Sequence, residues 1–533
     1  HLRGMFGVGI WDEPHQRLLI ARDRLGEKPL YYASLGDELI FASEAKALFE
    51  HPGLRRAVNH DALPSFLLLG YVPPPQTMFA GIEKLSPGEV LLLERGQIRK
   101  ALYWQPVMDA SHPPDYPEAV KQVRAALLET VEMQMMSDVP IGAFLSGGVD
   151  STAIVALMQR LSSKPVQTFT VGFDSPPGSV EDTKFNVDLR YAAGAAKAIG
   201  TEHHVITLKQ DHSLVALLPH LVYALDEPLS MPTIVQTAYV AALARLNGVP
   251  VLLSGEAGDE LFLGYNHYAL DRVVERYQRL PALLRSSLLT PLMERLPSDG
   301  LRKLARKSRQ TEPAGRYLEW LRRVEPERIA VLLSTVSRGT DPSGYGELNT
   351  QLAAVLGEPR SPHFADRLAY ADLRLALAEN MNLRVDKMSM AMSVESRAPL
   401  QDYKLAELAL RLPLSYKLRN GESKAVFRDA IRDLIPADVL KRPKWGFNPP
   451  ASDWLRTCLR PLVEQTLTPE RVAEVGIFRP EAISGIIQAH IVEHKYEMWS
   501  LWTALVFHLW HGLYIDGSIT LDHTLTAGEL YNV

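Results

Sequence analysis

A glycine turn at residues 146–151, which reads SGGVDS, limits the possible folds of this chain more than any other stretch. An apolar run at 139–145 precedes the turn, and a segment with helical apolar spacing, 152–161, follows it. Two adjacent glycines let backbone N–H groups approach a ligand closely, and the N-terminus of the next helix presents unpaired N–H groups. The pattern therefore predicts an anion site between a strand and a helix.

The composition of the turn narrows the kind of anion. Asp150 suits a phosphate site when a hard cation bridges its carboxylate to the phosphate oxygens. The spacing matches neither the Walker loop nor the dinucleotide-binding fingerprint. An ordinary strand–helix turn is the alternative, but the apolar run and Asp150 favour anion binding. SGGVDS resembles the pyrophosphate loop of ATP pyrophosphatases, which cleave ATP between its α and β phosphates.

Strand and helix patterns alternate after the turn, which predicts an α/β fold with a parallel sheet. Expected strands cover residues 166–172, 204–208 and 249–253, with helices between them. Ligands of such sheets bind at the carboxyl ends of the strands. The glycine turn and the motif after residue 253 both fall at that edge.

This second motif contains three carboxylates in five residues, Glu256, Asp259 and Glu260. They would repel one another unless a cation or a substrate lies among them. A helix N-terminus favours acids and explains Asp259 or Glu260, but not the whole string SGEAGDELFLGY. Beside the glycine turn, Asp259 and Asp150 can hold Mg²⁺ on the phosphates of ATP. Glu256 is then available as a general base or a substrate contact.

Several separated strings, in the same order, resemble the glutamine-hydrolysing asparagine synthetase family. They are SGEAGDELFLGY at 254–265, LDEP at 225–228, RVDKMSMAMSVESRAPLQD at 384–402, GESKAVFRDA at 421–430 and RPKWGFNPP at 442–450. The resemblance implies an asparagine synthetase-type ATP-pyrophosphatase domain, with the parallel sheet of adenine nucleotide α-hydrolases, over residues 118–533. Residues 107–117 are expected to form the linker before it.

Residues 1–106 are rich in strand patterns and resemble the second half of the family's class II glutamine amidotransferase domain, an N-terminal-nucleophile glutaminase. The matching strings include LRGMFGVGIWD, ARDRLGEKPLYY and FASEAKAL. The family nucleophile is a cysteine at the mature N-terminus, whereas residue 1 here is His and the only cysteine, Cys458, is expected in the core. We expect no glutaminase nucleophile in this chain, with the N-terminal part of that domain absent before His1. A protein that never had a working glutaminase is the alternative.

The resemblance also implies roles for individual residues. The pyrophosphate is held by Ser146, Gly147, Gly148, Asp150 and Ser151. The adenosine is lined by Leu145, Val171, Ser254 and Gly255. Asp150 and Asp259 bind Mg²⁺, and Glu256 takes a proton from the attacking ammonia. Lys424 stabilises the negative charge that develops on the phosphate during adenylation.

These roles predict a C–N bond-forming ligase with ATP and Mg²⁺ as cofactors and aspartate as the favoured carboxylate acceptor. Glutamine or ammonia would supply the nitrogen, and a homodimer stays open. The net charge of −5 gives no general attraction to nucleic acid, and no apolar run of about 18 residues suggests a membrane span. A single cysteine fits a cytoplasmic location.

Some positions depart from the family pattern and leave the acceptor open. Asn186 stands in a segment where Phe-Asp-Glu is usual, Gln401 replaces a usual Leu, and residues 229–234 follow the family only in part. The same chemistry on an envelope sugar, or lactam closure in a peptide, is therefore an alternative, as is a degenerate, non-catalytic homologue. The basic stretch 301–309 is expected to be a solvated helix face rather than a site for an anionic partner.

Overall fold

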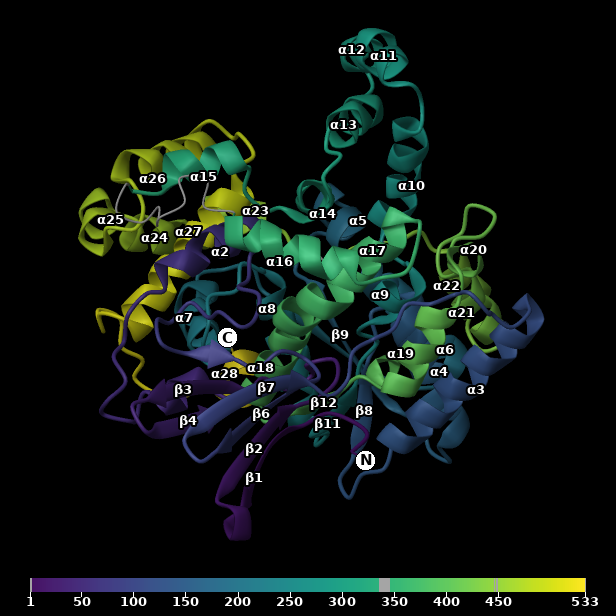
Figure 1. The fold of residues 1–533 in the computed structure, drawn as a ribbon, viewed down its shortest axis with the longest axis horizontal. Coiled ribbons are helices and arrows are strands. Elements are labelled where there is room, and N and C mark those ends of the chain that lie inside the picture. The colour runs from purple at the N-terminus through teal and green to yellow at the C-terminus, as the bar shows by residue number, and fades with distance from the viewer. Residues whose placement is uncertain (1, 335–345, 445, 447–448, 533) are drawn as a thin grey trace.

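The computed structural model describes residues 2–334, 346–444, 446 and 449–532. His1 and part of the 442–450 string lie outside the described residues. In the described part, strands and helices alternate around one parallel sheet, and two antiparallel sheets are built from the first hundred residues (Figure 1).

The N-terminal part forms the two antiparallel sheets. One has the order β1-β2-β6-β7 and the other β4-β3-β5. Their strands are β1 (Gly7–Asp12), β2 (Arg17–Arg22), β3 (Tyr31–Leu35), β4 (Glu38–Ala42), β5 (Glu83–Lys84), β6 (Glu89–Glu94) and β7 (Gln97–Leu102). A small apolar cluster of Ile20, Leu30, Tyr32, Leu85 and Leu91 draws on strands of both sheets. The β-rich character predicted for residues 1–106 is confirmed.

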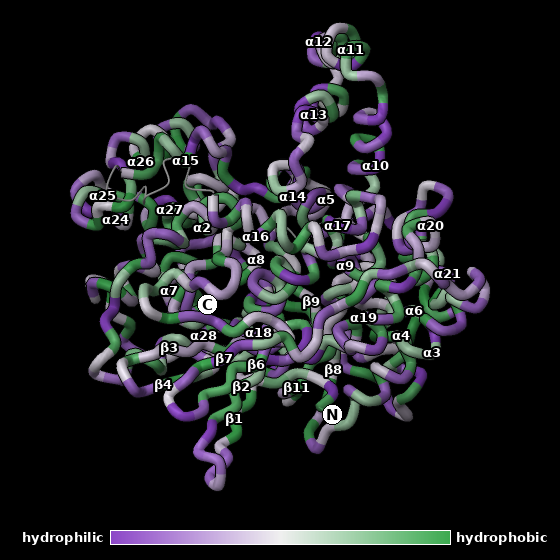
Figure 2. Tube along the Cα trace, viewed as in Figure 1, coloured by the Kyte–Doolittle hydropathy of each residue, from purple (hydrophilic) through white to green (hydrophobic). Residues whose placement is uncertain are grey.

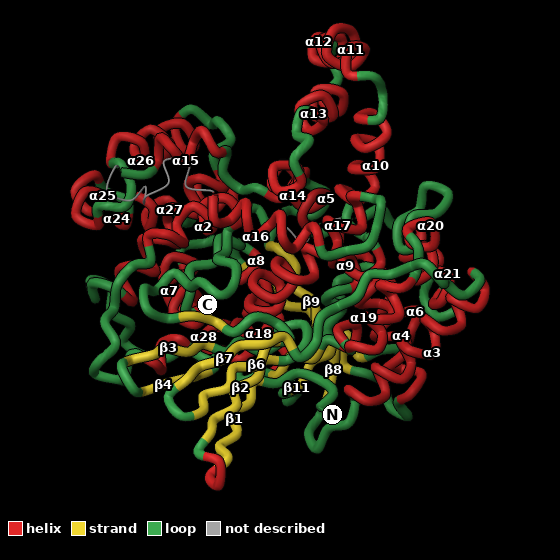
Figure 3. The backbone as a smooth tube through the Cα atoms, in the orientation of Figure 1, coloured by secondary structure: helices red, strands yellow, loops and turns green. Residues whose placement is uncertain are grey.

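The parallel sheet has the order β10-β9-β8-β11-β12, and every neighbouring pair in it is parallel. Its strands are β8 (Ile141–Phe144), β9 (Gln167–Phe173), β10 (Glu202–Leu208), β11 (Val251–Leu253) and β12 (Glu395–Arg397). Figure 3 shows β8 and β9 of this sheet among the helices that surround them. The predicted α/β class and the three predicted strands are confirmed.

Helices pack on the parallel sheet and on one another. They are α3 (Tyr116–Gln134), α4 (Val149–Leu161), α5 (Val180–Phe185), α6 (Val187–Ile199), α7 (Ser213–Leu225), α8 (Thr233–Leu246), α9 (Gly258–Phe262), α18 (Leu383–Ala391), α19 (Tyr403–Arg411), α21 (Ala425–Ile431) and α27 (Met498–Tyr514). Nine of the thirteen residues of α4 are buried, so most of the helix that follows the glycine turn lies in the core.

The other elements connect or extend this framework. They are η1 (Glu13–His15), α1 (Ala45–Leu48), η2 (His60–Ala62), α2 (Leu63–Leu69), α10 (Asn266–Gln278), α11 (Ala282–Leu284), η3 (Arg285–Leu289), α12 (Thr290–Arg295), α13 (Asp299–Ser308), α14 (Pro313–Leu321), α15 (Pro326–Leu332), α16 (Gly346–Gly357), α17 (Phe364–Ala371), η5 (Asp372–Asn382), η6 (Pro399–Gln401), α20 (Leu414–Lys417), α22 (Ala437–Lys441), α23 (Ala451–Arg456), α24 (Arg460–Thr466), α25 (Pro469–Val475), α26 (Pro480–Ile487), η7 (Gln488–Val492) and α28 (Ala527–Asn532).

The basic stretch 301–309 belongs to an arm made of α10 to α13, which projects from the body of the molecule (Figure 1). Polar and apolar residues are mixed along this arm (Figure 2). Among the residues that the structure describes, no helix is both long and apolar enough to cross a bilayer.

Many of these elements were not predicted from the sequence, and α2 and β12 illustrate two reasons. Helix α2 reads LPSFLLL and is buried on every side, so it has no polar face to produce a helical pattern. Strand β12 reads ESR, a composition with little strand preference, and it forms because it pairs with β11 at the edge of the sheet.

Buried ion pairs join the N-terminal sheets to the rest of the chain. Arg22 contacts Glu379 at 2.8 Å, and Lys84 contacts Glu227 and Glu379 at 2.8 Å each. All four side chains are at most 3% exposed. Because these charges match one another, the interface buries a neutral network rather than isolated ions.

Candidate active site

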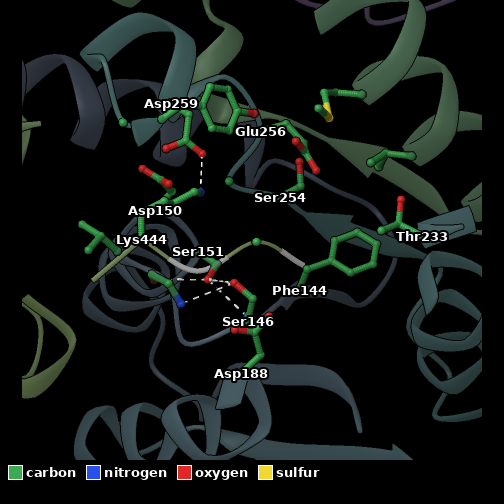
Figure 4. Close-up of a pocket in the computed structure, with 18 of the residues that line it drawn as sticks. Phe144, Ser146, Asp150, Ser151, Asp188, Thr233, Ser254, Glu256, Asp259 and Lys444 are labelled. Atoms are coloured by element: carbon green, nitrogen blue, oxygen red, sulfur yellow. Dashed lines mark hydrogen bonds and ion pairs between the residues drawn. The ribbon is translucent and has the colours of Figure 1, made fainter. Parts of the chain in front are cut away.

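A cavity of about 370 Å³ lies at the carboxyl ends of β8 and β11. The turns that follow these two strands form part of its wall, and Figure 4 shows their side chains around it. This is the edge of the parallel sheet at which the sequence places both motifs, and ligands of α/β sheets bind there.

The glycine turn is held in shape by its own serines. The Oγ atoms of Ser146 and Ser151 lie 3.0 Å apart, and the backbone N–H of Ser146 donates to Ser151 Oγ at 3.2 Å. Gly147 has φ +66°, and a Cβ there would lie 2.4 Å from the backbone nitrogen of Ala192. Only glycine therefore fits this position, where the chain turns into α4 against α6.

The second turn packs directly on the first. A Cβ on Gly255 would lie 2.8 Å from the backbone nitrogen of Ser151, and a Cβ on Gly258 would lie 2.4 Å from Asp150 Oδ1. The two glycines thus allow the acid-bearing turns to touch. Ala257 adopts φ +78° between them, an uncommon conformation for a residue with a side chain.

Two lysines neutralise the two aspartates of these turns. Lys424 Nζ lies 2.5 Å from Asp150 Oδ2 and 2.7 Å from Asp259 Oδ1, and Lys444 Nζ lies 2.5 Å from Asp259 Oδ2. Burial disfavours the charge on Asp259, but the two ammonium groups outweigh it and hold the pKa of this carboxyl well below its usual range. Asp259 is therefore an anion at neutral pH.

The donor set fits a hard divalent cation. Asp150 and Asp259 present carboxylate oxygens to one point, and these are the ligands that Mg²⁺ prefers. Within the described part of the chain, Asp259 Oδ1 is buried without a hydrogen bond, although Lys424 lies close to it. An acceptor atom of this kind has capacity left for a metal ion.

Glu256 lies in the same cavity but has a different partner. Arg384 donates from Nη2 to Glu256 Oε1 at 3.0 Å and from Nη1 to Thr233 Oγ1 at 3.0 Å. The neighbouring Glu260 accepts a hydrogen bond from Tyr265 at 2.9 Å. Burial and the charge of Asp259 raise the pKa of Glu260 to about 8. The three acids of the motif are thus in three different electrostatic environments.

Most of the predicted site residues come together around this cavity. Its wall includes Ser146, Gly148, Asp150, Ser151, Ser254, Gly255, Glu256, Asp259 and Lys424. The side chains of Leu145 and Val171 are instead buried, at 1% and 3% exposure, and neither is among the residues that line the cavity. Gly147 shapes the turn without lining the cavity.

Sequence reasoning missed several charged residues of the wall. Lys444 and Arg442 lie in the 442–450 string, and Arg384 begins the 384–402 string, so the motifs contained a signal for them. Arg442 donates to the backbone oxygen of Ser146 at 3.2 Å and also pairs with Asp188. Arg323 comes from a segment without any motif, and no local pattern could have identified it.

The departures from the family pattern have different structural consequences. Asn186 is buried and exchanges two hydrogen bonds with the backbone of Phe173, at 2.8 and 2.9 Å, so it fastens the end of β9. Gln401 is buried and bonded to Asn382. In segment 229–234, by contrast, Met231 and Thr233 line the cavity. Cys458 is buried in the core, as predicted.

A second, smaller cavity of about 20 Å³ adjoins the first. Ser254 and Glu256 line both cavities, and Glu27 of the N-terminal part lines the smaller one. Burial, together with the charge of Asp23, raises the pKa of Glu27 well above its usual range. The small cavity thus connects the Glu256 side of the site to the N-terminal sheets.

The fold and the site together define an ATP-dependent amidotransferase. A phosphate-type glycine turn and an acidic turn meet on a parallel sheet, beside antiparallel sheets of the glutaminase type. The family model described as Asparagine synthase matches residues 122–512, and the one described as Glutamine amidotransferase domain matches residues 1–104. The chain belongs to the asparagine synthase family and is a ligase that forms carbon–nitrogen bonds.

Curated relatives agree with this assignment. A Mycobacterium tuberculosis protein provisionally described as a glutamine-hydrolyzing asparagine synthetase is 33% identical over 97% of this chain and 78% of its own length. Asparagine synthetase (glutamine-hydrolyzing) 1 of Bacillus subtilis is 30% identical, with the same coverage of both chains. The amidase chyE of Penicillium rubens is 25% identical over 89% of this chain and 74% of its own length.

One solved structure, of the allosteric regulatory enzyme of purine biosynthesis, matches 36% of this chain and 44% of its own at 12% identity. Its TM-score is 0.12, so it supports no further argument.

Proposed function

We propose that this protein adenylates the side-chain carboxylate of aspartate with MgATP and transfers ammonia to it, giving asparagine, AMP and pyrophosphate. The observation that carries the proposal is the meeting of the two acid-bearing turns at Lys424, which contacts both Asp150 and Asp259. A site with two acids and matched cations suits a nucleotide whose phosphates bring both negative charge and a metal ion.

The first step is transfer of the adenylyl group. A carboxylate oxygen of the acceptor attacks the α-phosphorus, and the bond to the β-phosphate oxygen breaks, so that pyrophosphate leaves. The N–H groups and serines of the glycine turn hold the departing phosphates, and Lys424 stabilises the charge that develops on the α-phosphate oxygens. Asp150 and Asp259 would hold Mg²⁺, which when bound offsets the charge of the phosphates.

The second step forms the amide. Ammonia attacks the activated carbonyl carbon, the bond to the phosphate oxygen breaks, and AMP leaves with the electron pair. The carboxylate of Glu256 takes one proton from the attacking nitrogen. The hydrogen bond from Arg384 orients Glu256, and Thr233 in turn orients Arg384.

Glutamine is the proposed nitrogen source when a working glutaminase site is present. The match of residues 1–104 to a glutamine amidotransferase domain supports this, as does the small cavity between Glu27 and Glu256. Cys458 is buried and is not among the residues that line the small cavity, so it is not a candidate nucleophile. An activity test should therefore supply ammonium directly, so that it does not depend on glutamine hydrolysis.

The test mixes the protein with ammonium, aspartate and MgATP and identifies the products. AMP and pyrophosphate should accumulate in equal amounts with asparagine, and only when aspartate is present. Formation of ADP and phosphate would contradict adenylation. Absence of any ATP binding in titration calorimetry would favour a non-catalytic homologue.

The same chemistry on another acceptor is a second candidate. Segment 229–234, whose sequence follows the family pattern only in part, contributes Met231 to the cavity wall, and Met381 lies in the wall too. Flexible, apolar thioethers accommodate acceptors of varied shape. Pyrophosphate release over a panel of amino acids, carboxylated peptides and acidic sugars separates the two candidates. Faster release with a panel member than with aspartate would select the second.

A further inference from the structure

Arg323 occupies the wall of the main cavity directly after α14, in a part of the chain without motifs. Its backbone N–H donates to Leu68 O at 2.6 Å, which ties it to the end of α2. Its guanidinium carbon lies 4.1 Å from the ring centroid of Trp499, and Nη2 lies 3.2 Å from the sulfur of Met231. Packing therefore fixes this side chain where it meets the cavity.

This guanidinium has no counter-charge in the described part of the chain. No carboxylate there forms an ion pair with it, and its Nε is buried without a hydrogen-bond partner. The nearby arginines differ, since Arg316 pairs with Asp271 and Arg322 with Glu325, each at 2.6 Å. Burial lowers the pKa of Arg323 to about 10. Because this charge is partly buried and unpaired, an anionic ligand group that meets it removes part of its desolvation cost.

The other cations of the wall already have partners. Lys424 and Lys444 meet the two aspartates, and Arg384 meets Glu256. Arg428 has no carboxylate partner among the residues that the structure describes, but it donates to the backbone oxygens of Ser423 and Leu440. Arg323 is thus the wall cation with the most unused donors, because a guanidinium carries five N–H groups.

Arg323 also lies on the acceptor side of the cavity rather than the phosphate side. Its neighbour Met231 is two residues from Thr233, which binds Arg384 and through it Glu256. The glycine turn has its own cation in Arg442, which donates to the backbone of Ser146. An anion that meets Arg323 is therefore a group of the acceptor and not a phosphate of the nucleotide.

We propose that Arg323 binds a second anionic group of the acceptor, carried on the same molecule as the carboxylate that is adenylated. The inference rests on the proposed function and restricts its substrate class to amino acids and other acceptors with two anionic groups. Arg323 is then the residue that rejects an acceptor with a neutral group at this position, because such a molecule leaves the guanidinium unpaired. A carboxylate as the second anionic group of the acceptor would meet the guanidinium through a bidentate contact.

The test compares aspartate with aspartate α-amide, which keeps the reacting side chain and lacks the second charge. Titration calorimetry should show aspartate binding to the wild type about tenfold or more tightly than the α-amide, as expected for a charge-assisted hydrogen bond. Arg323→Met should bind both equally weakly. In steady-state assays the KM for aspartate should rise by about the same factor, while the KM for ATP stays within twofold. Arg323→Lys should restore part of the preference.

Arg279→Met is the matched control, since Arg279 is 65% exposed, lies outside the cavity and pairs only with Glu275 in the described chain. It should leave both affinities unchanged. Without ligand, Arg323→Met should melt at or above the wild-type temperature, because it removes an unpaired charge; a lower melting temperature together with unchanged aspartate affinity marks a structural role and overturns the proposal.

The proposal is also overturned if the wild type binds aspartate and aspartate α-amide with equal affinity. Equal affinity of the wild type and Arg323→Met for aspartate overturns it too, and so does a wild type that binds neither ligand. The proposed function fails separately, when aspartate binds but no pyrophosphate is released.

Discussion

At the scale of single residues, the site depends on side chains held in costly states. Lys424 has a left-handed backbone with φ 55° and is 3% exposed. Such a conformation costs about 1–2 kcal/mol outside glycine. It persists because the ammonium group joins Asp150 to Asp259. The residue that the sequence singled out for adenylation is thus also the one that joins the two turns.

Variants of Lys424 and Glu256 should separate the two chemical steps. Lys424→Met should lower the rate of pyrophosphate release by about 10²-fold or more, because a preorganised cation is lost from the developing charge. Glu256→Gln should keep aspartate-dependent pyrophosphate release and lose asparagine formation. Both products are measured in one reaction, and circular dichroism checks that the variants fold. The same defect in both variants would contradict the separate roles.

The buried imidazole of His508 should make the stability of the folded protein depend on pH. It is buried in α27, bonds through Nδ1 to Ala504 O at 2.8 Å, and has no partner for Nε2 among the described residues. Burial lowers its pKa to about 4. The unfolded chain takes up a proton below about pH 6.5 and the folded chain does not, so this histidine removes stability as pH falls from 6.5 to 4, by about 3 kcal/mol in total.

The melting temperature of His508→Phe, relative to that of the wild type, should therefore rise as the pH is lowered from 6.5 to 4. His112→Phe, at an exposed position, provides the control. A difference between His508→Phe and wild type that does not change with pH would show that His508 does not titrate as described.

At the scale of elements, glycines set how closely the active-site turns approach. Gly264 follows α9, and a Cβ there would lie 1.9 Å from Asp259 Oδ1 and 2.0 Å from Lys424 Cε. The end of this short helix is thus packed against the charged cluster that it helps to position. The same packing explains why a glycine stands at position 264, after the acids of the string.

Gly264→Ala should damage activity more than folding. The added methyl group must displace Asp259 or Lys424, so pyrophosphate release should fall by about tenfold or more, at a stability cost of about 1–3 kcal/mol. Gly194→Ala, inside α6 and with no atom near the added carbon, should instead stabilise the protein by about 0.5–1 kcal/mol. Kinetics and thermal melts of the two variants make the comparison. Wild-type rates in Gly264→Ala would argue against the packed cluster.

At the scale of the whole molecule, the N-terminal sheets and the ATP-pyrophosphatase part share a buried network of matched charges. Arg22 and Lys84 come from the first part, and Glu227 and Glu379 from the second. The small cavity that reaches Glu27 lies at the same junction. The two parts are therefore joined by buried ion pairs, in which the loss of one partner leaves the other charge buried and uncompensated.

Glu379→Leu should destabilise this junction strongly. It leaves Arg22 and Lys84 with one carboxylate between them, and breaking a buried pair in this way costs about 3–5 kcal/mol. Thermal unfolding and limited proteolysis after residue 104 provide the measurements. Glu464→Leu removes an exposed partner of Arg460 and should change stability by less than about 1 kcal/mol. Equal melting temperatures for the two variants would contradict a structural role for the network.

Much of the local geometry of this protein could be predicted from its sequence. Apolar runs and glycine positions predicted β8, β9, β10 and β11, the helix after the glycine turn, and the edge of the sheet at which both motifs lie. Strand and helix periods, and the backbone freedom of glycine, act over a few residues and can be recognised without a structure. The same local signal failed for α2 and β12, which owe their form to burial and to pairing.

Which charges meet depends on the packing of distant segments and could not be predicted from the sequence. Lys424 reaches Asp150 across 274 residues of sequence, and Arg384 reaches Glu256 across 128. Within the described residues, Arg323 has no carboxylate partner whereas Arg316 and Arg322 each have one, and this difference is equally a result of packing. Electrostatic energy depends on distance and burial rather than on chain order, so these pairings, and the acceptor specificity proposed from them, become defined only when the elements are packed together.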